Sequence, residues 1–157
     1  MGENTFLDTY RKAIGLTLVA LFLSSCSLPR IITLKDPLTP EEHISLGRSY
    51  ENSGEYAPAI EQYETAAKDL PIAYLYIGNL YFQKGEYERA EEAYEKAIKK
   101  TGDPIAYNNL AWLYYTTDRK MKKAEELAEK AVSLSPGSED YKDTLNKIRQ
   151  KISGVQP

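Results

Sequence analysis

The feature that most constrains the fold of this chain is a segment that recurs three times in tandem. The small residues Gly47, Gly78 and Ala111 mark the same point in each copy, and they are spaced 31 and 33 residues apart. Each copy contains two amphipathic stretches of about 12 residues with a turn between them. A period of this size is typical of a solenoid, whose units bury their apolar faces against neighbouring units. The copies occupy residues 46–71, 77–100 and 110–136.

Small residues at matched points predict how the two stretches of each copy cross. Gly47, Gly78 and Ala111 allow a close approach of the second stretch, which offers an alanine at the crossing point. These alanines are Ala59, Ala90 and Ala124. Tyrosines fill the remaining space, so each copy is predicted to be a helix–turn–helix pair.

The second copy carries an ordered series of such residues: Tyr74, Ile77, Gly78, Tyr81, Ala90, Tyr94 and Ala97. This series resembles the tetratricopeptide repeat, whose helix A carries an aromatic residue, Leu-Gly and Tyr, and whose helix B carries Ala, an aromatic residue and Ala. The resemblance extends over residues 40–136. It implies an all-α fold, a right-handed solenoid of three helix–turn–helix repeats plus a C-terminal capping helix. The implied repeats occupy 39–70, 71–103 and 104–137, the capping helix 138–151 and a frayed tail 152–157.

Two residues depart from the tetratricopeptide pattern. His43 stands where the first repeat should carry its helix-A aromatic residue, and Ala128 replaces the helix-B aromatic residue of the third repeat. Because His43 lies near Glu41 and Glu42, two alternatives remain open for it, a packed core side chain and a metal ligand. The first helix is predicted to begin after Thr39, which can form a capping box with Glu42.

The N-terminal residues 1–25 are predicted to be an export signal. Arg11-Lys12 precedes an apolar run over 13–23, which is shorter than the about 20 residues needed to span a bilayer. A charged start, a short apolar core and small residues at the end are typical of a signal peptide. Leu23-Ser24-Ser25-Cys26 resembles the bacterial lipobox, which implies cleavage before Cys26 and diacylation of its thiol. The alternatives are an ordinary signal peptide or a buried helix in which Cys26 is incidental.

Residues 26–38 are predicted to be the lipidated cysteine followed by an extended tether, because two prolines interrupt any regular pattern there. At ~3.3 Å per residue, the tether would hold the folded part up to ~40 Å from the lipid. We therefore expect the protein to be lipid-anchored in a bacterial cell envelope. In a Gram-negative cell, Ser27 after the cysteine implies the outer membrane, facing the periplasm.

The composition argues against several classes of function. The chain has 20 Lys and Arg against 23 Asp and Glu, a net charge of −3, so no nucleic-acid partner is expected. The single Cys excludes an internal disulfide and a redox pair, and the single His excludes an HExxH zinc site. We expect no catalytic residue, no cofactor and no metal site, and the protein is not predicted to be an enzyme.

In the tetratricopeptide family, a second stripe of residues on each helix A lines a concave groove. The matching residues are Ile44 and Arg48 in the first repeat, Ile72, Leu75, Asn79, Phe82 and Gln83 in the second, and Ile105, Asn108, Trp112 and Tyr115 in the third. The amides of Asn79 and Asn108 can donate and accept hydrogen bonds at once, which suits the backbone of an extended peptide. Arg48 is the single cation in this stripe, so the two-lysine clamp that some such repeats use for C-terminal carboxylates is missing.

Trp112 is the predicted anchor for a bound segment, because aromatic residues dominate binding hot spots. Phe82, Tyr115 and Ile105 are expected to lie around it. The alternative is that some stripe residues pack between neighbouring repeats instead, and this alternative stays open for Leu75, Ile105 and Trp112.

The resemblance implies a lipid-anchored interaction module, a scaffold or assembly factor of the envelope. Its partner would be another envelope protein, which contributes a peptide segment or a helix to the groove. One alternative is a self-associating structural lipoprotein. Another is an accessory subunit of a secretion system or an envelope peptidase, because residues 38–43 and the repeats resemble the segment found beside double-glycine-type cysteine peptidases. The sequence leaves the oligomeric state open.

Overall fold

The computed structural model describes residues 36–154. This part of the chain contains seven α-helices and no β-strand, which confirms the predicted all-α class. The helices are α2 (Pro40–Asn52), α3 (Tyr56–Ala66), α4 (Ala73–Gln83), α5 (Tyr87–Thr101), α6 (Pro104–Thr116), α7 (Met121–Leu134) and α8 (Glu139–Ser153). Within the described residues, no helix is both long and apolar enough to cross a membrane. Cys26, the predicted signal peptide and most of the predicted tether lie outside the described residues.

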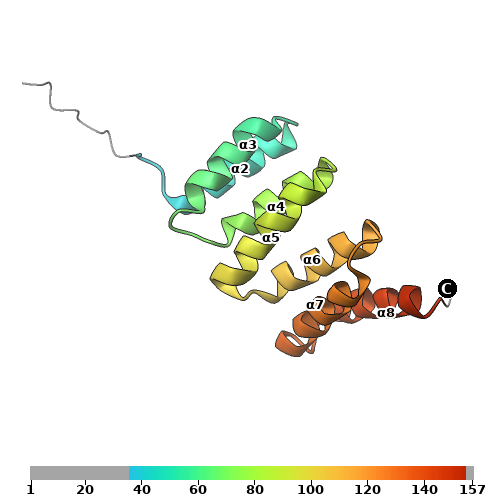
Figure 1. Ribbon diagram of the computed structural model, residues 1–157. Coiled ribbons are helices and arrows are strands. Elements are labelled where there is room, and N and C mark those ends of the chain that lie inside the picture. The colour runs from blue at the N-terminus through green and yellow to red at the C-terminus, as the bar shows by residue number, and fades with distance from the viewer. Residues whose placement is uncertain (1–35, 155–157) are drawn as a thin grey trace, which may run out of the picture. The chain divides into compact units, whose positions relative to one another are not determined.

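The helices pack in consecutive pairs, α2 with α3, α4 with α5 and α6 with α7 (Figure 1). The pairs are joined because α3 also packs on α4, and α5 on α6. The last helix, α8, packs on both helices of the third pair. This arrangement confirms the solenoid of three helix–turn–helix repeats followed by a C-terminal helix.

Local signals set where the first and last helices begin and end. α2 starts with the predicted capping box, in which the backbone N–H of Glu42 donates to Thr39 Oγ1 (3.2 Å) and that of Thr39 donates to Glu42 Oε2 (2.7 Å). α8 is capped by Ser138, whose side chain accepts from the backbone N–H of Tyr141. The helix continues to Ser153, past its predicted end at residue 151, and stops at Gly154 with a φ of +73°.

The turns inside the repeats reverse the chain in two ways. Gly54 and Gly85 have φ values of +78° and +76°, in the left-handed region that glycine adopts without steric cost. The third turn lacks glycine and places Asp118 (φ +53°) and Lys120 (φ +47°) in that region. Because a left-handed non-glycine residue costs ~1–2 kcal/mol, this turn needs support from other contacts. An ion pair between Lys120 and Glu91 of α5 supplies one.

A glycine faces a tyrosine ring at the helix crossing of each of the first two repeats. A Cβ on Gly47 would lie 2.6 Å from Cε1 of Tyr63, and a Cβ on Gly78 would likewise overlap the ring of Tyr94. Both tyrosines are almost fully buried. Glycine is therefore required on helix A wherever helix B places a tyrosine at this crossing.

The third repeat has a different pair of residues at the same helix crossing. Ala111 replaces the glycine and Ala128 replaces the tyrosine, and both alanines are fully buried. Without a ring on helix B, there is room for a Cβ on helix A. The departure at Ala128 is therefore matched by the change from glycine to Ala111.

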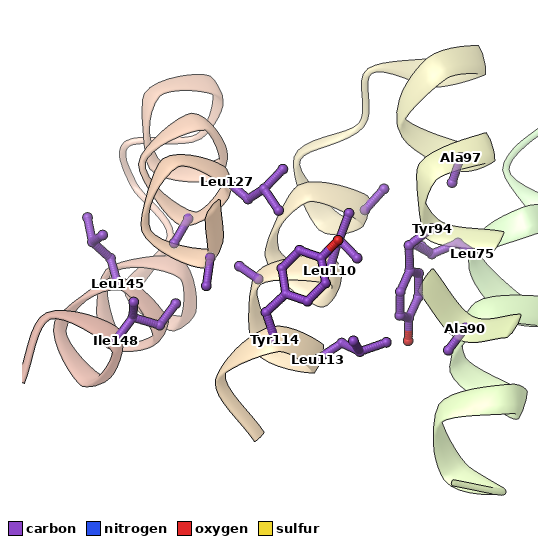
Figure 2. Packing of buried hydrophobic residues seen from close by; sticks show 14 residues of the cluster. Leu75, Ala90, Tyr94, Ala97, Leu110, Leu113, Tyr114, Leu127, Leu145 and Ile148 are labelled. Atoms are coloured by element: carbon purple, nitrogen blue, oxygen red, sulfur yellow. The ribbon is translucent and has the colours of Figure 1, made fainter. Parts of the chain in front are cut away.

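The largest apolar cluster is continuous from the second repeat to α8. It includes Leu75 and Tyr94 of the second repeat, Leu113 of α6 and Ile148 of α8. Figure 2 shows Leu113 reaching from α6 toward Tyr94 of α5, across the junction between repeats. Ile148 is fully buried at the other end of the cluster, so α8 closes the core of the third repeat.

Gly78→Ala is expected to destabilise the protein by about 1–3 kcal/mol, because the added methyl group overpacks the contact with Tyr94. Helix propensity acts in the opposite direction and favours alanine by ~1 kcal/mol. Urea unfolding followed by circular dichroism measures the net change. Ala111→Gly is the matched control, with an expected loss of ~1 kcal/mol from propensity. A Gly78→Ala protein as stable as the wild type would show that the tyrosine ring does not require glycine.

Ile148→Ala is expected to lower the free energy of unfolding by about 2–5 kcal/mol, since it removes a fully buried side chain and leaves a cavity. Ile152→Ala, on the same helix at a position 44% exposed, is the control and should change stability by less than about 0.5 kcal/mol. Both values come from the same unfolding experiment. Equal effects of the two substitutions would mean that α8 is not docked through Ile148.

Candidate functional site

The first helices of the repeats, α2, α4 and α6, carry the predicted groove residues. α4 contacts α6, and α6 contacts α8, so α4, α6 and α8 lie side by side along the solenoid. We call the predicted residues that remain accessible on α2, α4 and α6 the helix-A face. Its exposed members are Arg48, Asn79, Gln83 and Ile105. Its partly exposed members are Ile44, Ile72, Phe82, Asn108, Trp112 and Tyr115.

Leu75 does not belong to this face, which corrects its assignment to the groove. It is 6% exposed and packs in the largest core cluster with Ala90 and Tyr94. A leucine at a junction between repeats gains more from burial than from a peptide contact, so the packing alternative holds for Leu75. Ile105 is 42% exposed, and the packing alternative does not hold for it.

The rings of Trp112 and Tyr115 form an aromatic pair on α6, with centroids 5.1 Å apart. Two lysines of α8 lie over these rings. Lys147 Nζ is 5.5 Å from the centroid of Trp112, and Lys151 Nζ is 5.0 Å from that of Tyr115. Cation–π contacts at such sites contribute ~0.5–1 kcal/mol each, so α8 helps to hold the pair in place. Trp112 lies in none of the core clusters of the described residues and is partly exposed.

The expected surroundings of Trp112 are found in part. Tyr115 lies next to it, as predicted. The ring of Phe82 packs against Tyr87 at the start of α5, with a centroid distance of 5.8 Å. The predicted proximity of Phe82 and Ile105 to Trp112 stays a prediction.

Only part of the Asn79 side chain is available to bind a ligand. Its Oδ1 accepts a hydrogen bond from the hydroxyl of Tyr94 (2.9 Å) and a second from Nδ2 of Asn109 (2.9 Å). Since the carbonyl is used by two donors, the NH₂ group is the part of Asn79 that remains for a ligand. The contact with Asn109 also joins α4 to α6 across the boundary between repeats.

Asn108 has a hydrogen-bond acceptor that is not used within the described residues. Its Oδ1 is buried and has no hydrogen-bond partner within residues 36–154. Buried polar atoms are paired in the great majority of cases, so an acceptor left without a donor calls for an explanation. Because this atom is buried, a bound segment could pair with it only after the side chain of Asn108 rotates outward.

The turn between α6 and α7 is bound to the second repeat. Arg119 Nη1 donates to Glu88 Oε1 (2.9 Å), and Lys120 Nζ donates to Glu91. The hydroxyl of Tyr114 also donates to Glu91 (2.8 Å), and burial raises the pKa of Tyr114 to about 12. Burial of the Glu91 carboxylate opposes its ionisation, but hydrogen bonds from Lys120 and Tyr114 outweigh this and lower its pKa. These charges therefore stabilise the junction between repeats.

His43 is a packed side chain. It is 6% exposed, and its Nδ1 lies 2.7 Å from Oε1 of Gln62 on α3. Within the described part of the chain, no group of three or more His, Cys, Asp or Glu residues could hold a metal ion. Of the two alternatives for His43, the core position is the one that the structure shows.

Three residues of the site were not predicted from the sequence, namely Asn109, Lys147 and Lys151. The two lysines were missed because α8 was interpreted as a cap without a binding role. The available signal was the resemblance of Asp143-Thr144-Leu145 to the start of a fourth helix A. Asn109 was missed because the neighbouring Asn108 was assigned to the groove. The side chains of the two residues leave α6 in different directions, and it is Asn109 that reaches Asn79.

Comparison with known proteins finds a matching family and similar solved structures. The family model described as "Tetratricopeptide repeat" matches residues 44–104 and again residues 77–139, which together cover more than half of the chain. No curated protein matches the chain.

Three solved structures illustrate the similarity. The first tetratricopeptide domain of Spaghetti (RPAP3), bound to an HSP90 peptide of sequence SRMEEVD, has a TM-score of 0.66 and 20% identity, covering 75% of this chain and 96% of that chain. The Sgt2 domain from Aspergillus fumigatus has a TM-score of 0.65 and 25% identity, covering 75% and 84%. MamA has a TM-score of 0.64 and 27% identity, covering 76% and 71%.

Proposed function

Because this chain belongs to the tetratricopeptide repeat family, we propose that it is a non-catalytic interaction module that binds a segment of a partner protein on its helix-A face. The segment is an extended peptide or a helix. The observation that carries this proposal is the accessible aromatic pair of Trp112 and Tyr115, which is held from one side by the lysines of α8.

The aromatic pair has the properties of a binding hot spot. Large aromatic side chains dominate the binding energy of interfaces, and a rigid anchor loses little conformational entropy when a partner docks. Trp112 is positioned by Tyr115 and Lys147 while it remains partly exposed. An apolar side chain of the partner would therefore find a preformed contact surface.

The asparagines give the face a way to recognise a peptide backbone. The NH₂ group of Asn79 can donate to a backbone carbonyl, because its Oδ1 is already used by Tyr94 and Asn109. The unpaired Oδ1 of Asn108 is buried, so it can accept from a backbone N–H only after its side chain rotates outward. A donor from Asn79 and an acceptor from Asn108 would then match the alternating groups of an extended chain.

Two similar structures support peptide binding in general terms. The first RPAP3 domain is described with an HSP90 peptide, and the second RPAP3 domain with an HSP70 peptide of sequence SGPTIEEVD. Those peptides are ligands of the RPAP3 domains. For this chain, they support the proposed class of ligand, which is a short segment of another protein.

We further propose that the module is lipid-anchored in a bacterial cell envelope, on the outer membrane facing the periplasm if the cell is Gram-negative. The support is Leu23-Ser24-Ser25-Cys26 directly after a short apolar run. Lipid on Cys26 would place the repeats at a limited height above the bilayer, so the partner would be another envelope protein.

Trp112→Ala is expected to weaken binding of the partner by 2 kcal/mol or more, about thirtyfold in affinity, because it removes the anchor. The partner is identified by in-cell crosslinking from a photoreactive residue at the exposed position 105, which leaves Trp112 in place. Its purified segment is then titrated calorimetrically into the wild type and the variant. Circular dichroism should show the same helical content in both proteins, since Trp112 lies outside the core clusters.

Leu134→Ala provides the control, because Leu134 is an exposed apolar residue (44%) at the end of a helix B. It should leave the affinity within twofold of the wild type. The proposal is wrong if Leu134→Ala loses the partner and Trp112→Ala retains it.

Cys26→Ser is expected to abolish labelling of the protein with a radioactive fatty acid, because the thiol is the proposed acceptor of the lipid. The variant should accumulate as an unprocessed precursor or as protein that washes off membranes. Normal acylation of this variant would rule out Cys26 as the anchor.

A further inference from the structure

The turn between α6 and α7 has an aspartate where the other two turns have glycine. In each turn, one backbone N–H donates to the carbonyl three residues before it, and the next N–H donates to the carbonyl five residues before it. The residue that makes the first of these bonds is Gly54, Gly85 or Asp118, and each has a positive φ. Asp118 therefore occupies the glycine position, at a steric cost that glycine avoids.

The side chain of Asp118 makes a contact that glycine could not make. Its Oδ1 lies 3.2 Å from Nζ of Lys151 on α8. The same ammonium group donates to the backbone carbonyl of Tyr115 (3.0 Å) and lies 5.0 Å from the centroid of the Tyr115 ring. Asp118 therefore helps to fix where Lys151 lies on the aromatic pair.

The two lysines over the aromatic pair are held in different ways. Lys147, which lies over Trp112, pairs with Asp143 at 2.5 Å, one turn earlier on the same helix. Its position is therefore set within α8. Lys151 instead depends on a carboxylate of the α6–α7 turn, so a change in that turn should move Lys151 and leave Lys147 in place.

The second repeat holds the turn that carries Asp118. The two residues that follow it, Arg119 and Lys120, both pair with Glu91 of α5, and Arg119 Nη2 lies 3.3 Å from Glu91 Oε2. The Glu91 side chain is 13% exposed, so salt screens these pairs less than pairs on the open surface. Because these contacts fix the backbone directly after Asp118, Glu91 can act on Lys151 through the turn.

We propose that Asp118 and Glu91 are positioning residues of the helix-A face. Asp118 holds Lys151 over Tyr115, and Glu91 holds the turn that carries Asp118. This rests on the proposed function, because Tyr115 belongs to the aromatic pair at which the partner segment binds. The second repeat thus takes part in shaping a contact surface that α6 and α8 form.

NMR of the lysine ε-methylene groups measures this positioning directly. Protons over the face of an aromatic ring resonate upfield, so Lys147 and Lys151 should each give an upfield signal in the full-length protein labelled with ¹³C-lysine. Each signal is assigned by its loss in Lys147→Arg or Lys151→Arg. No partner segment is added, so failure of this proposal is distinguishable from failure of partner binding at Trp112.

Asp118→Asn is the main variant, because asparagine also adopts the left-handed conformation and removes the charge with little change in shape. The Lys151 signal should lose most of its upfield displacement, while the Lys147 signal and the melting temperature stay near those of the wild type. Asp143→Asn is the matched variant with the reverse result. It should move the Lys147 signal and leave the Lys151 signal in place.

Glu91→Gln tests the action through the turn, since no hydrogen bond or ion pair joins Glu91 to Lys151 within residues 36–154. It should move the Lys151 signal in the same direction as Asp118→Asn, to a smaller extent, and leave the Lys147 signal in place. Glu126→Gln is the control, at a side chain of α7 that is 64% exposed, and it should move neither signal.

Two results would overturn the role of Asp118: a Lys151 signal that keeps its displacement in Asp118→Asn, or equal movement of both lysine signals in that variant. A Lys151 signal that is unchanged in Glu91→Gln would overturn the role of the second repeat. If Glu91→Gln fails to fold, Arg119→Gln takes its place, because it removes a contact of the turn with Glu91 at a side chain that is 37% exposed.

Discussion

The contact between a helix-A glycine and a helix-B tyrosine is the constraint on which the first two repeats depend. Gly47 and Gly78 have no side chain, so the rings of Tyr63 and Tyr94 can pack directly against the backbone of helix A. The same tyrosines extend to polar residues of helix A. The hydroxyl of Tyr63 donates to Glu51 (2.7 Å), and that of Tyr94 donates to Asn79. Each tyrosine thus ties the core of a repeat to a polar residue of helix A, and in the second repeat that residue, Asn79, belongs to the proposed binding face.

This link makes the binding face a consequence of how the repeats pack. Asn79 offers its NH₂ group because Tyr94 and Asn109 occupy its carbonyl oxygen. Tyr76 of α4 stacks on Tyr63 of the preceding repeat, with centroids 5.4 Å apart, so the first junction is held by a similar contact between repeats. A change in a core tyrosine would therefore alter both the stability of a repeat and the groups that it presents to a partner.

The repeat spacing and the small residues were sufficient to predict the helix pairs, because close helix crossing depends on residue size, which is visible in a sequence. The position of Leu75 was not predicted, since a leucine fits equally well in a core and in a groove. The lysines over Trp112 and Tyr115 were missed because their placement depends on how α8 packs against α6. The hydrogen bonds of Asn79 could not be predicted, since Asn108 and Asn109 compete for the same role and only the rotation of α6 decides between them.

The central claim is that a partner segment binds on the helix-A face at Trp112. Trp112 is the single tryptophan of the chain, so its indole N–H gives one assignable NMR signal. The most direct measurement follows that signal, together with the side-chain NH₂ signals of Asn79 and Asn108, as the partner segment is titrated to saturation. All three signals are expected to shift along the same binding curve. If a segment saturates the protein while these signals stay in place, the partner does not bind at Trp112.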